Sequence, residues 1–493
     1  MQKFDICVIG VGTVGAFAGY YLAKKGLKTA LVDIYSPPHD KGSYHGDTRI
    51  FRIAYGEGEK YIPMLKRAFD LWGEFEKETD TKLFERCGVI NIGHKNSDFM
   101  INIIKSVNDY KLDCEIIDKK EIEERYKFFV PSDFIGVYEK NTGYVYSDKS
   151  IITASNEAKK LGAKEYYNEE ITEIKKNYNS YLIISKNYEF ETKNIVLSAG
   201  TYSDEILNLL LKIMPLPCIP IFKKRKIFSW WKSEEYIYGK LPAFTFEIDG
   251  DHYYGFPNAG DGFKIGKNLS GQYYNKREER VPFGELEEDK NEIGEHARKF
   301  MPYIGDFIEG KSCSYPMSLD EDFIIDFLNK DILFFGGLSH GFKFATVLGE
   351  LAMKAFTEKD FKPFIAGINA GADCILVSHN IVNCMDKNYP ASLSEKVHKI
   401  IRNQLNFNGV IMTDDLIMDA ITEFTGDESA AVIATKAGND LLCCSSVDTQ
   451  YPAVLKAVKN NEIPINQIND SVKRILKWKI DLGILDADTI LNS

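Results

Sequence analysis

The first 33 residues limit the possible folds of this chain more than any other segment. Residues 4–9 read FDICVI, a short apolar run, and GVGTVG follows at Gly10–Gly15. A helical stretch then ends near Gly26, and TALVD at Thr29–Asp33 is a second apolar run that closes on an acid. This order predicts a strand, a glycine-rich turn, a helix and a second strand, which is how a parallel α/β sheet begins.

Such a turn is suited to the phosphates of a dinucleotide. Gly10 permits the tight bend, Gly12 lets the backbone approach a pyrophosphate, and Gly15 lets the helix pack close to the strand. The helix N-terminus adds free N–H groups and the positive end of its dipole. Asp33 is placed to accept hydrogen bonds from ribose hydroxyls. The pattern therefore predicts a Rossmann-like domain, and it does not distinguish NAD from FAD.

The composition excludes several classes of protein. At roughly 100–200 residues per domain, 493 residues predict about three domains. The net charge of −11 argues against nucleic-acid binding, and no apolar run reaches the roughly 18 residues of a membrane helix. Nine cysteines are scattered without a CxxC pair, and the N-terminus does not resemble a secretory leader. We therefore expect a cytoplasmic protein with free thiols and no metal site.

The pattern changes near residue 364. Beyond it, apolar runs at Cys374–Ser378, Val410–Thr413 and Asp440–Cys444 alternate with helical stretches, and each run ends in polar residues. Consecutive βα units of a parallel sheet or barrel have this pattern. We expect about three strands in this part of the chain.

Several motifs in the first part resemble one enzyme family. They are SPPHDKGSYHGDTRIFRIAYGEGEKY at Ser36–Tyr61, and further along CGVINIG, DHYYGFPNAGDGFKIGKN, KSCSYPMSLDEDFIID and LSHGFKFATVLGE. Residues 1–364 resemble the monomeric sarcosine oxidase family and its N-methyltryptophan oxidase branch, which are FAD enzymes of the D-amino-acid-oxidase-like superfamily.

The resemblance implies a mixed α/β (α+β) fold in two parts. A Rossmann-like FAD-binding domain would comprise residues of about 1–80, 150–215 and 305–364. An inserted substrate domain with an antiparallel sheet would comprise about 81–149 and 216–304.

The resemblance also implies roles for individual residues. Cys313 matches the cysteine that forms a thioether to the flavin, so FAD would be covalently bound. Arg52 and Lys343 match the pair that holds the substrate carboxylate, and a planar guanidinium suits that anion. Lys264 matches a lysine implicated in oxygen activation, where a cation would stabilise developing negative charge.

Four further residues carry expected roles. Tyr254 and Tyr315 match tyrosines that line the substrate cavity, and Arg49 matches an arginine beside the flavin ring. Gly337 and Gly341 belong to a segment that would bring backbone N–H groups and a helix N-terminus to the pyrimidine end of the flavin.

The implied activity is the oxidation of N-methyl amino acids, of the N-methyl-L-tryptophan or sarcosine type, to the amino acid, formaldehyde and hydrogen peroxide. The expected partners are the small substrate and oxygen, and we expect a monomer or weak oligomer.

Two departures from the family pattern bear on the catalytic activity. Asn268 replaces a histidine that the family usually has, and the Ser339–Gly341 loop is one glycine shorter than the family pattern SGHGF. A flavin oxidoreductase for another amino acid, or a fusion product with impaired catalysis, remain alternatives.

Residues 365–493 resemble a different family, the β-N-acetylhexosaminidases of glycoside hydrolase family 3. The similarity lies in INAGADCILVSHN, YPASLSEKVHKIIRNQLNFNGVIMTDDLIMDAI and INDSVKRILKWKIDLGIL. Asp414 matches the nucleophile of that family. Its general acid/base would lie on an earlier loop, and the barrel needs its first strands. We therefore expect a partial (β/α) barrel fragment without glycosidase activity.

Overall fold

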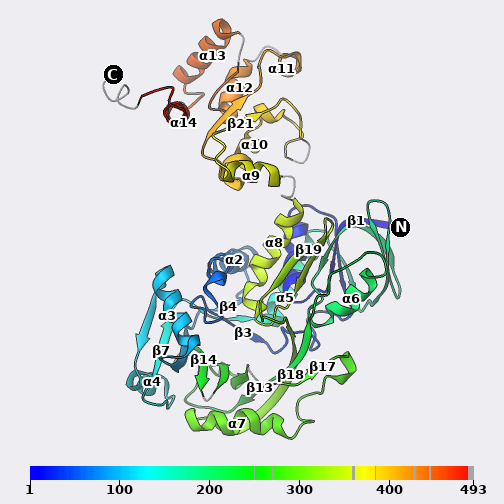
Figure 1. Ribbon diagram of the computed structural model, residues 1–493, viewed down its shortest axis with the longest axis vertical. Helices are drawn as coiled ribbons and strands as arrows, with labels where there is room; N and C mark the ends of the chain where they lie inside the picture. Colours follow the sequence, from blue (N-terminus) through cyan, green and yellow to red (C-terminus); the bar gives the residue numbers. More distant parts are fainter. Residues whose placement is uncertain are drawn as a thin grey trace. The chain divides into compact units, whose positions relative to one another are not determined.

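The strand, turn, helix and strand predicted at the N-terminus are confirmed in the computed structural model of the chain. They are β1 (Gln2–Ile9), α1 (Thr13–Lys24) and β2 (Thr29–Asp33). The chain forms two compact units, Met1–Phe356 and Thr357–Ser493 (Figure 1). No helix among the described residues is long and apolar enough to cross a membrane. The structure describes residues 1–248, 250–268, 271–357, 361–382, 385–425, 429–443 and 446–486.

These first strands belong to an eight-stranded sheet in the first unit. Its main order is β10 (Ile171–Lys176), β11 (Tyr181–Ser185), β12 (Glu189–Leu197), β1, β2 and β9 (Lys164–Tyr167). The second half of β12 also pairs in parallel with β20 (Ile332–Gly336), which pairs in turn with β19 (Ile324–Asn329). Because β1, β2, β12 and β20 are parallel, their carboxyl ends meet at one edge of the sheet, where ligands bind in α/β folds.

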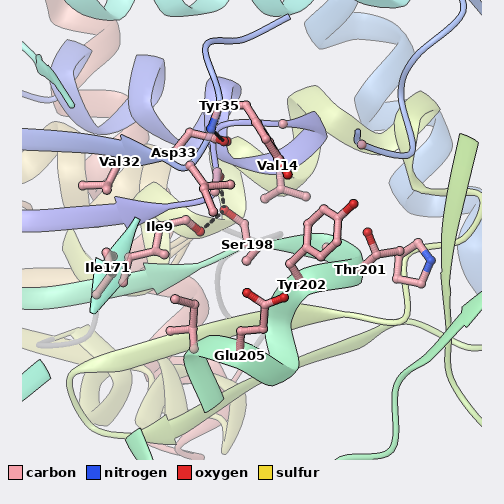
Figure 2. Close-up of a pocket in the computed structure, with 18 of the residues that line it drawn as sticks. Ile9, Val14, Val32, Asp33, Tyr35, Ile171, Ser198, Thr201, Tyr202 and Glu205 are labelled. Atoms are coloured by element: carbon pink, nitrogen blue, oxygen red, sulfur yellow. Dashed lines mark hydrogen bonds between the residues drawn. The ribbon is translucent and has the colours of Figure 1, made fainter. Parts of the chain in front are cut away.

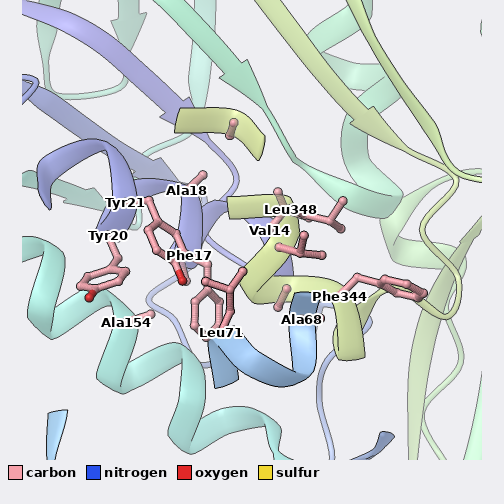
Figure 3. Close-up of a cluster of buried hydrophobic side chains, with 14 of the residues drawn as sticks. Val14, Phe17, Ala18, Tyr20, Tyr21, Ala68, Leu71, Ala154, Phe344 and Leu348 are labelled. Carbon is pink, nitrogen blue, oxygen red and sulfur yellow. The ribbon is translucent and has the colours of Figure 1, made fainter. Parts of the chain in front are cut away.

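Helices cover one face of this sheet. They are α1, α2 (Ile62–Thr79), α5 (Ser147–Lys160) and α8 (Ala345–Thr357). Figure 3 shows side chains of α1 among Leu71 of α2, Ala154 of α5 and Leu348 of α8. Phe17 at the centre of this cluster is fully buried, and burying such a ring contributes about 1.5–3 kcal/mol. The packing holds the N-terminus of α1 at the carboxyl edge of the sheet.

A second, nine-stranded sheet in the same unit is mostly antiparallel. β18 (Phe307–Met317) pairs with β13 along its whole length, so this sheet extends to Met317. Apart from β18, the strands follow one another across the sheet in the order β17 (Tyr273–Tyr274), β13 (Phe222–Trp231), β16 (Phe263–Lys267), β15 (Asp251–Phe256), β14 (Ala243–Ile248), β5 (Val89–His94), β7 (Phe134–Glu139) and β6 (Cys114–Ile117).

Strand alternation gives this sheet two different faces. One face is apolar: Phe244, Phe263 and Ile265 belong to a buried cluster that includes Ile293 of α7 (Glu288–Phe300). The register places the alternate residues on the opposite face, which we call the site face. The site face carries Asn91, Lys226, Phe228, Trp230, Thr245, Tyr254, Phe256, Lys264, Cys313 and Tyr315.

A small sheet carries the two arginines singled out in the sequence. β3 (Thr48–Phe51) pairs with β8 (Gly143–Tyr146), which also pairs with β4 (Phe84–Glu85). Arg49 lies within β3, and Arg52 follows its last residue.

The second unit contains a two-stranded parallel sheet of β21 (Cys374–Val377) and β22 (Val410–Thr413). The strand predicted at Asp440–Cys444 is shorter in the structure. It consists of a single bridge from Leu441 to Met412, and residue 444 lies outside the described residues. The carboxylate of Asp440 accepts hydrogen bonds from the Ile411 N–H and from Arg402. The Ile411 N–H of β22 is therefore bonded to a side chain and not to the backbone of a neighbouring strand. The helices of this unit include α9 (Lys362–Asn369), α10 (Glu395–Lys399), α11 (Asp419–Thr425), α12 (Ala430–Ala437), α13 (Val447–Lys459) and α14 (Ile465–Asp481).

Candidate functional site

A cavity of about 490 Å³ lies at the carboxyl edge of the eight-stranded sheet. Figure 2 shows its wall, with Val32 and Asp33 from β2, Ser198 after β12, and Thr201 and Tyr202 of the following turn. Gly10 and Gly12 also line it, as does Gly336 at the end of β20. The glycine-rich turn thus opens into a space at the sheet edge, as the sequence predicts.

The glycines of the turn have the conformations that a phosphate-binding turn requires. Gly10 has φ +88°, and a Cβ there would lie 2.6 Å from Cα of Ala199. A Cβ on Gly15 would lie 1.8 Å from the Gly10 carbonyl oxygen, so only glycine permits this contact. Gly12 lines the cavity just before α1 begins. These residues fit a dinucleotide pyrophosphate approaching the N-terminus of α1.

Asp33 holds the glycine-rich turn in place. Its Oδ2 accepts a hydrogen bond of 2.7 Å from the Val11 N–H, and its Oδ1 accepts one of 2.9 Å from the Tyr35 N–H. The carboxylate also lines the cavity. Asp33 therefore has a structural role, in addition to the ribose contact expected from the sequence.

A smaller cavity of about 90 Å³ lies beside the first. Both are lined by Thr13, Ser43 and Leu338, so the two cavities adjoin at these residues. We call the smaller cavity the inner cavity. Of the residues with expected roles, it is lined by Arg49, Arg52, Tyr254, Tyr315, Gly341 and Lys343.

Lys264 lies buried on the site face, among aromatic rings. Its Nζ is 4.7 Å from the ring centroid of Phe228 and 4.9 Å from that of Phe256. It donates hydrogen bonds to the Gly46 carbonyl and to the carbonyl and hydroxyl of Thr48. Burial, with Arg49 nearby, holds the pKa of the Lys264 ammonium well below its usual range.

Arg49 and Cys313 lie close together. The Arg49 guanidinium donates hydrogen bonds to the Thr48 carbonyl at 2.8 Å and to the Ser43 carbonyl at 2.7 Å. Burial raises the pKa of the Cys313 thiol, and the positive charge of Arg49 opposes that shift. Cys313 pairs with Lys226 across β18 and β13. Tyr315 lies two residues further along β18, on the same site face.

Arg52 is engaged by a residue that the sequence reasoning missed. Its Nη2 donates to both carboxylate oxygens of Glu57, at 2.7 and 2.8 Å, and its Nη1 donates to Oδ1 of Asn91 at 3.0 Å. Burial alone would raise the pKa of Glu57, but Arg52, His340 and Lys343 outweigh it and hold the pKa at about 2. An acid five residues after an arginine in RIAYGE was the only signal in the sequence.

Lys343 also lines the inner cavity, and the charge of Glu57 acts on it. Its Nζ donates to the His340 carbonyl at 2.9 Å and to the Tyr55 hydroxyl at 3.3 Å. Burial lowers the pKa of Lys343 to about 7, although Glu57 favours the charged form. Arg52 thus pairs with Glu57 directly, whereas Lys343 interacts with that carboxylate only through its charge.

The two departures from the family pattern meet in the structure. Asn268, just after β16, lies within hydrogen-bond distance of the imidazole of His340, in the loop after β20. Burial lowers the pKa of His340 to about 4, so its imidazole is neutral at neutral pH. Gly337 in this loop has φ +65°, and the chain enters a short turn at Gly341–Phe344 before α8.

Residues 5–355 match the family model described as "FAD dependent oxidoreductase". The chain belongs to this family. The glycine turn, the two adjoining cavities and the basic side chains of Arg52 and Lys343 therefore lie within an FAD-dependent oxidoreductase. The residues at the larger cavity fit the cofactor that the family name states.

Relatives and solved structures agree with this family. The chain is 40% identical to N-methyl-L-tryptophan oxidase of Escherichia coli O139:H28, over 74% of this chain and 98% of the relative. It is also 40% identical to the enzyme of that name from Yersinia pestis, over 71% and 94%. Structures of NikD, "an unusual amino acid oxidase", and of glycine oxidase from Geobacillus kaustophilus share the fold, with TM-scores of 0.65 and 0.61. They cover 72% and 74% of this chain and 94% and 98% of their own, at 16% and 15% identity.

The C-terminal part matches a different model. Residues 343–478 match "Glycosyl hydrolase family 3 N terminal domain". Asp414 follows β22 and so lies at the carboxyl end of a parallel strand, where barrel enzymes place catalytic groups. Its neighbour His379, after β21, contacts the Ser392 hydroxyl at 2.8 Å and the Asp415 carbonyl at 3.0 Å. Among the described residues, no group of three or more His, Cys, Asp or Glu could hold a metal ion.

Proposed function

We propose that the first unit is an FAD-dependent oxidase of N-methyl amino acids, of the N-methyl-L-tryptophan or sarcosine type. The observation that carries this proposal is the pair of buried basic side chains, Arg52 and Lys343, at an inner cavity that adjoins the dinucleotide cavity. The 40% identity to N-methyl-L-tryptophan oxidases supports the substrate class.

In this proposal Arg52 and Lys343 bind the substrate carboxylate. The substrate takes the place of Glu57 on the guanidinium fork, and a carboxylate beside Lys343 favours its charged form. Tyr254 and Tyr315, both largely buried on the site face, bound the space that the substrate amine occupies. The binding energy of the carboxylate orients the N-methyl group toward the cofactor.

Bound FAD supplies a hydride acceptor, so the N-methyl carbon loses the equivalent of a hydride, and the resulting imine is hydrolysed to formaldehyde and the primary amino acid. Oxygen is then reduced to hydrogen peroxide. Lys264 stabilises the negative charge that develops on oxygen. Its Nζ lies among carbonyls and rings in a water-poor setting, where burial favours the neutral amine and a developing anion favours the ammonium. Arg49 contributes a second fixed positive charge at the same place.

We also propose that the flavin is covalently bound through Cys313. The cysteine is fully buried on the site face, where burial raises the pKa of its thiol and the charges of Arg49 and Lys264 oppose that shift. A thiolate is the reactive form of cysteine.

A substrate panel tests the proposed function. Purified full-length protein should release peroxide with N-methyl-L-tryptophan, with sarcosine, or with both, in preference to proline and glycine. Arg52→Ala should lower kcat/KM for these substrates by about 30- to 1000-fold, since a charge-assisted hydrogen bond in a desolvated site contributes on the order of 2–4 kcal/mol.

N-methyltryptamine, which lacks the carboxylate, serves as the matched control substrate, and Arg52→Ala should leave its slow oxidation unchanged. Peroxide from proline or glycine alone would instead favour the alternative, a flavin oxidase for another amino acid. No turnover of any amine by flavin-loaded protein would favour a fusion product with impaired catalysis.

A further inference from the structure

The segment that follows Arg52 is irregular, and side chains from distant elements hold it. It lies between β3, which ends at Phe51, and a short turn that begins at Glu59. Buried backbone groups need partners, which neighbouring strands usually supply. Here Ser106 donates to the Tyr55 carbonyl at 3.3 Å, and Asn102 donates to the Gly56 carbonyl at 3.1 Å.

Glu139 supplies the charged part of this support. Its carboxylate accepts a hydrogen bond from the Ile53 N–H at 2.9 Å and another from the Ala54 N–H at 3.1 Å. Two consecutive N–H groups therefore point at one buried anion, 85 residues away in the sequence. Hydrogen bonds to a charged acceptor are stronger than those between neutral groups.

The position of Glu139 relates it to the other partner of Arg52. Glu139 is the last residue of β7, opposite Val89 of β5, and Asn91 is two residues along β5 on the same face. Asn91 accepts from the Arg52 guanidinium, while Glu139 accepts from the backbone directly after Arg52. Two adjacent strands thus hold the side chain of Arg52 and the backbone of the two residues that follow it.

We propose that Glu139 is a positioning residue for the substrate carboxylate, because its carboxylate anchors the backbone of Ile53 and Ala54 and so keeps the Arg52 guanidinium directed at the inner cavity. The inference rests on the proposed role of Arg52. Glu139 itself does not line the inner cavity.

Charge makes this anchor dependent on pH. Burial raises the pKa of Glu139 to about 7, although the two N–H groups and Arg52 favour its ionised form. The Cys114 thiol, which is paired with Glu139 between β6 and β7, also interacts with it, and Asp113 adds negative charge beside that thiol. Above pH 7 the carboxylate accepts both hydrogen bonds. Below pH 7 the protonated carboxyl presents an O–H to an N–H, and the anchor weakens.

Glu139→Gln tests the inference in the flavin-loaded full-length protein. Glutamine keeps the shape but directs an NH₂ group at a backbone N–H. We expect KM for the N-methyl amino acid to rise roughly ten-fold at pH 9, with kcat within about two-fold, since one charge-assisted hydrogen bond is lost. The ratio of mutant to wild-type KM should fall toward one between pH 9 and pH 5.5. Lys343 also titrates near pH 7, but it is present in both proteins and cancels in the ratio.

Hydrogen exchange supplies a readout that does not depend on activity. Peptides covering residues 52–57 should exchange faster in Glu139→Gln than in the wild type at pH 9. Glu85→Gln is the matched control, a buried glutamate of the same unit that is bonded to Tyr238 and Lys82 instead. It should change neither measurement.

Unchanged KM together with unchanged exchange in Glu139→Gln would overturn the inference, as would a loss of kcat at constant KM. Should Glu139→Gln not fold, Glu139→Asp, which withdraws the carboxylate by one methylene, should show the same rise in KM. If the wild type oxidises no N-methyl amino acid, the proposed function fails. Faster hydrogen exchange of residues 52–57 in Glu139→Gln would then still show that Glu139 holds this backbone segment.

Discussion

The side-chain amide of Asn268 lies 3.0 Å from Nε2 of His340, and this contact joins β16 to the loop after β20. The imidazole is neutral, because burial lowers its pKa to about 4. A neutral amide therefore suffices as its partner. The asparagine and the shortened loop, which the sequence presents as separate departures, form one contact.

Asn268→Asp should raise the pKa of His340. A carboxylate at hydrogen-bond distance favours the imidazolium, so we expect the pKa to move from about 4 to above the ordinary value of about 6.5. Histidine NMR, with His340→Gln for assignment, measures it. Asn268→Ala removes the partner without adding charge and should leave the pKa low. An unchanged value in the aspartate variant would show that the contact is not maintained in solution.

Glu57→Gln should strengthen substrate binding. Glu57 occupies the fork of Arg52, so a neutral amide there leaves the guanidinium more available to a substrate carboxylate. We expect KM to fall by roughly three- to ten-fold, because the competing ion pair is only partly buried. Steady-state kinetics of peroxide release at pH 8 measure this. Glu59→Gln, which breaks only a surface pair with Lys105, is the control and should not change KM. A higher KM in Glu57→Gln would mean that Glu57 supports Arg52 more than it competes.

Lys264→Met should slow the reaction of reduced enzyme with oxygen. Removing a preorganised cation from a desolvated site costs on the order of 100-fold in rate, and reduction by substrate should be less affected. Stopped-flow spectroscopy separates the two half-reactions. Lys311→Met is the matched control, because Lys311 also lies over Trp230 but is more exposed. Equal losses in both half-reactions of Lys264→Met would contradict the assigned role.

Cys313→Ala should release the flavin on acid denaturation. In the wild type the yellow colour should stay with the precipitated protein, and mass spectrometry should find the flavin on the peptide that contains Cys313. Cys7→Ala is the control, since Cys7 is equally buried but lies in the core of the eight-stranded sheet. Free flavin from the wild type would refute covalent attachment.

A chain that ends at Phe364 should remain an active flavoprotein. The first unit has its own buried core and both cavities, so its kcat and Tm should match those of the full chain. The full chain should not hydrolyse an aryl N-acetylglucosaminide, because general acid catalysis is typically worth 10²–10⁴-fold and we expect the partner acid to belong to an earlier part of the barrel than residues 365–493 supply. Hydrolysis that Asp414→Asn abolishes would overturn this expectation.

Local patterns in the sequence were enough to predict the strands and the turn. The GVGTVG turn, the helix after it and the strands on either side depend on backbone sterics and short-range periodicity, which are readable in one stretch of chain. The strand predicted at Asp440–Cys444 was wrong as to extent. The buried Asp440 carboxylate competes with strand pairing there, because it forms ion pairs with Arg402 and Arg474 from other elements. The local sequence pattern does not indicate these ion pairs.

By itself, the sequence determined the family, the glycine turn and the identity of the cations at the site. Only the tertiary structure decided which polar groups meet. Glu57 pairs with the Arg52 guanidinium, Glu139 binds the backbone after Arg52, and Asn268 contacts His340. The reason is physical. Periodicity reflects interactions within a few residues of each other, whereas the pKa and partner of a buried charge depend on desolvation and on groups brought together across two sheets.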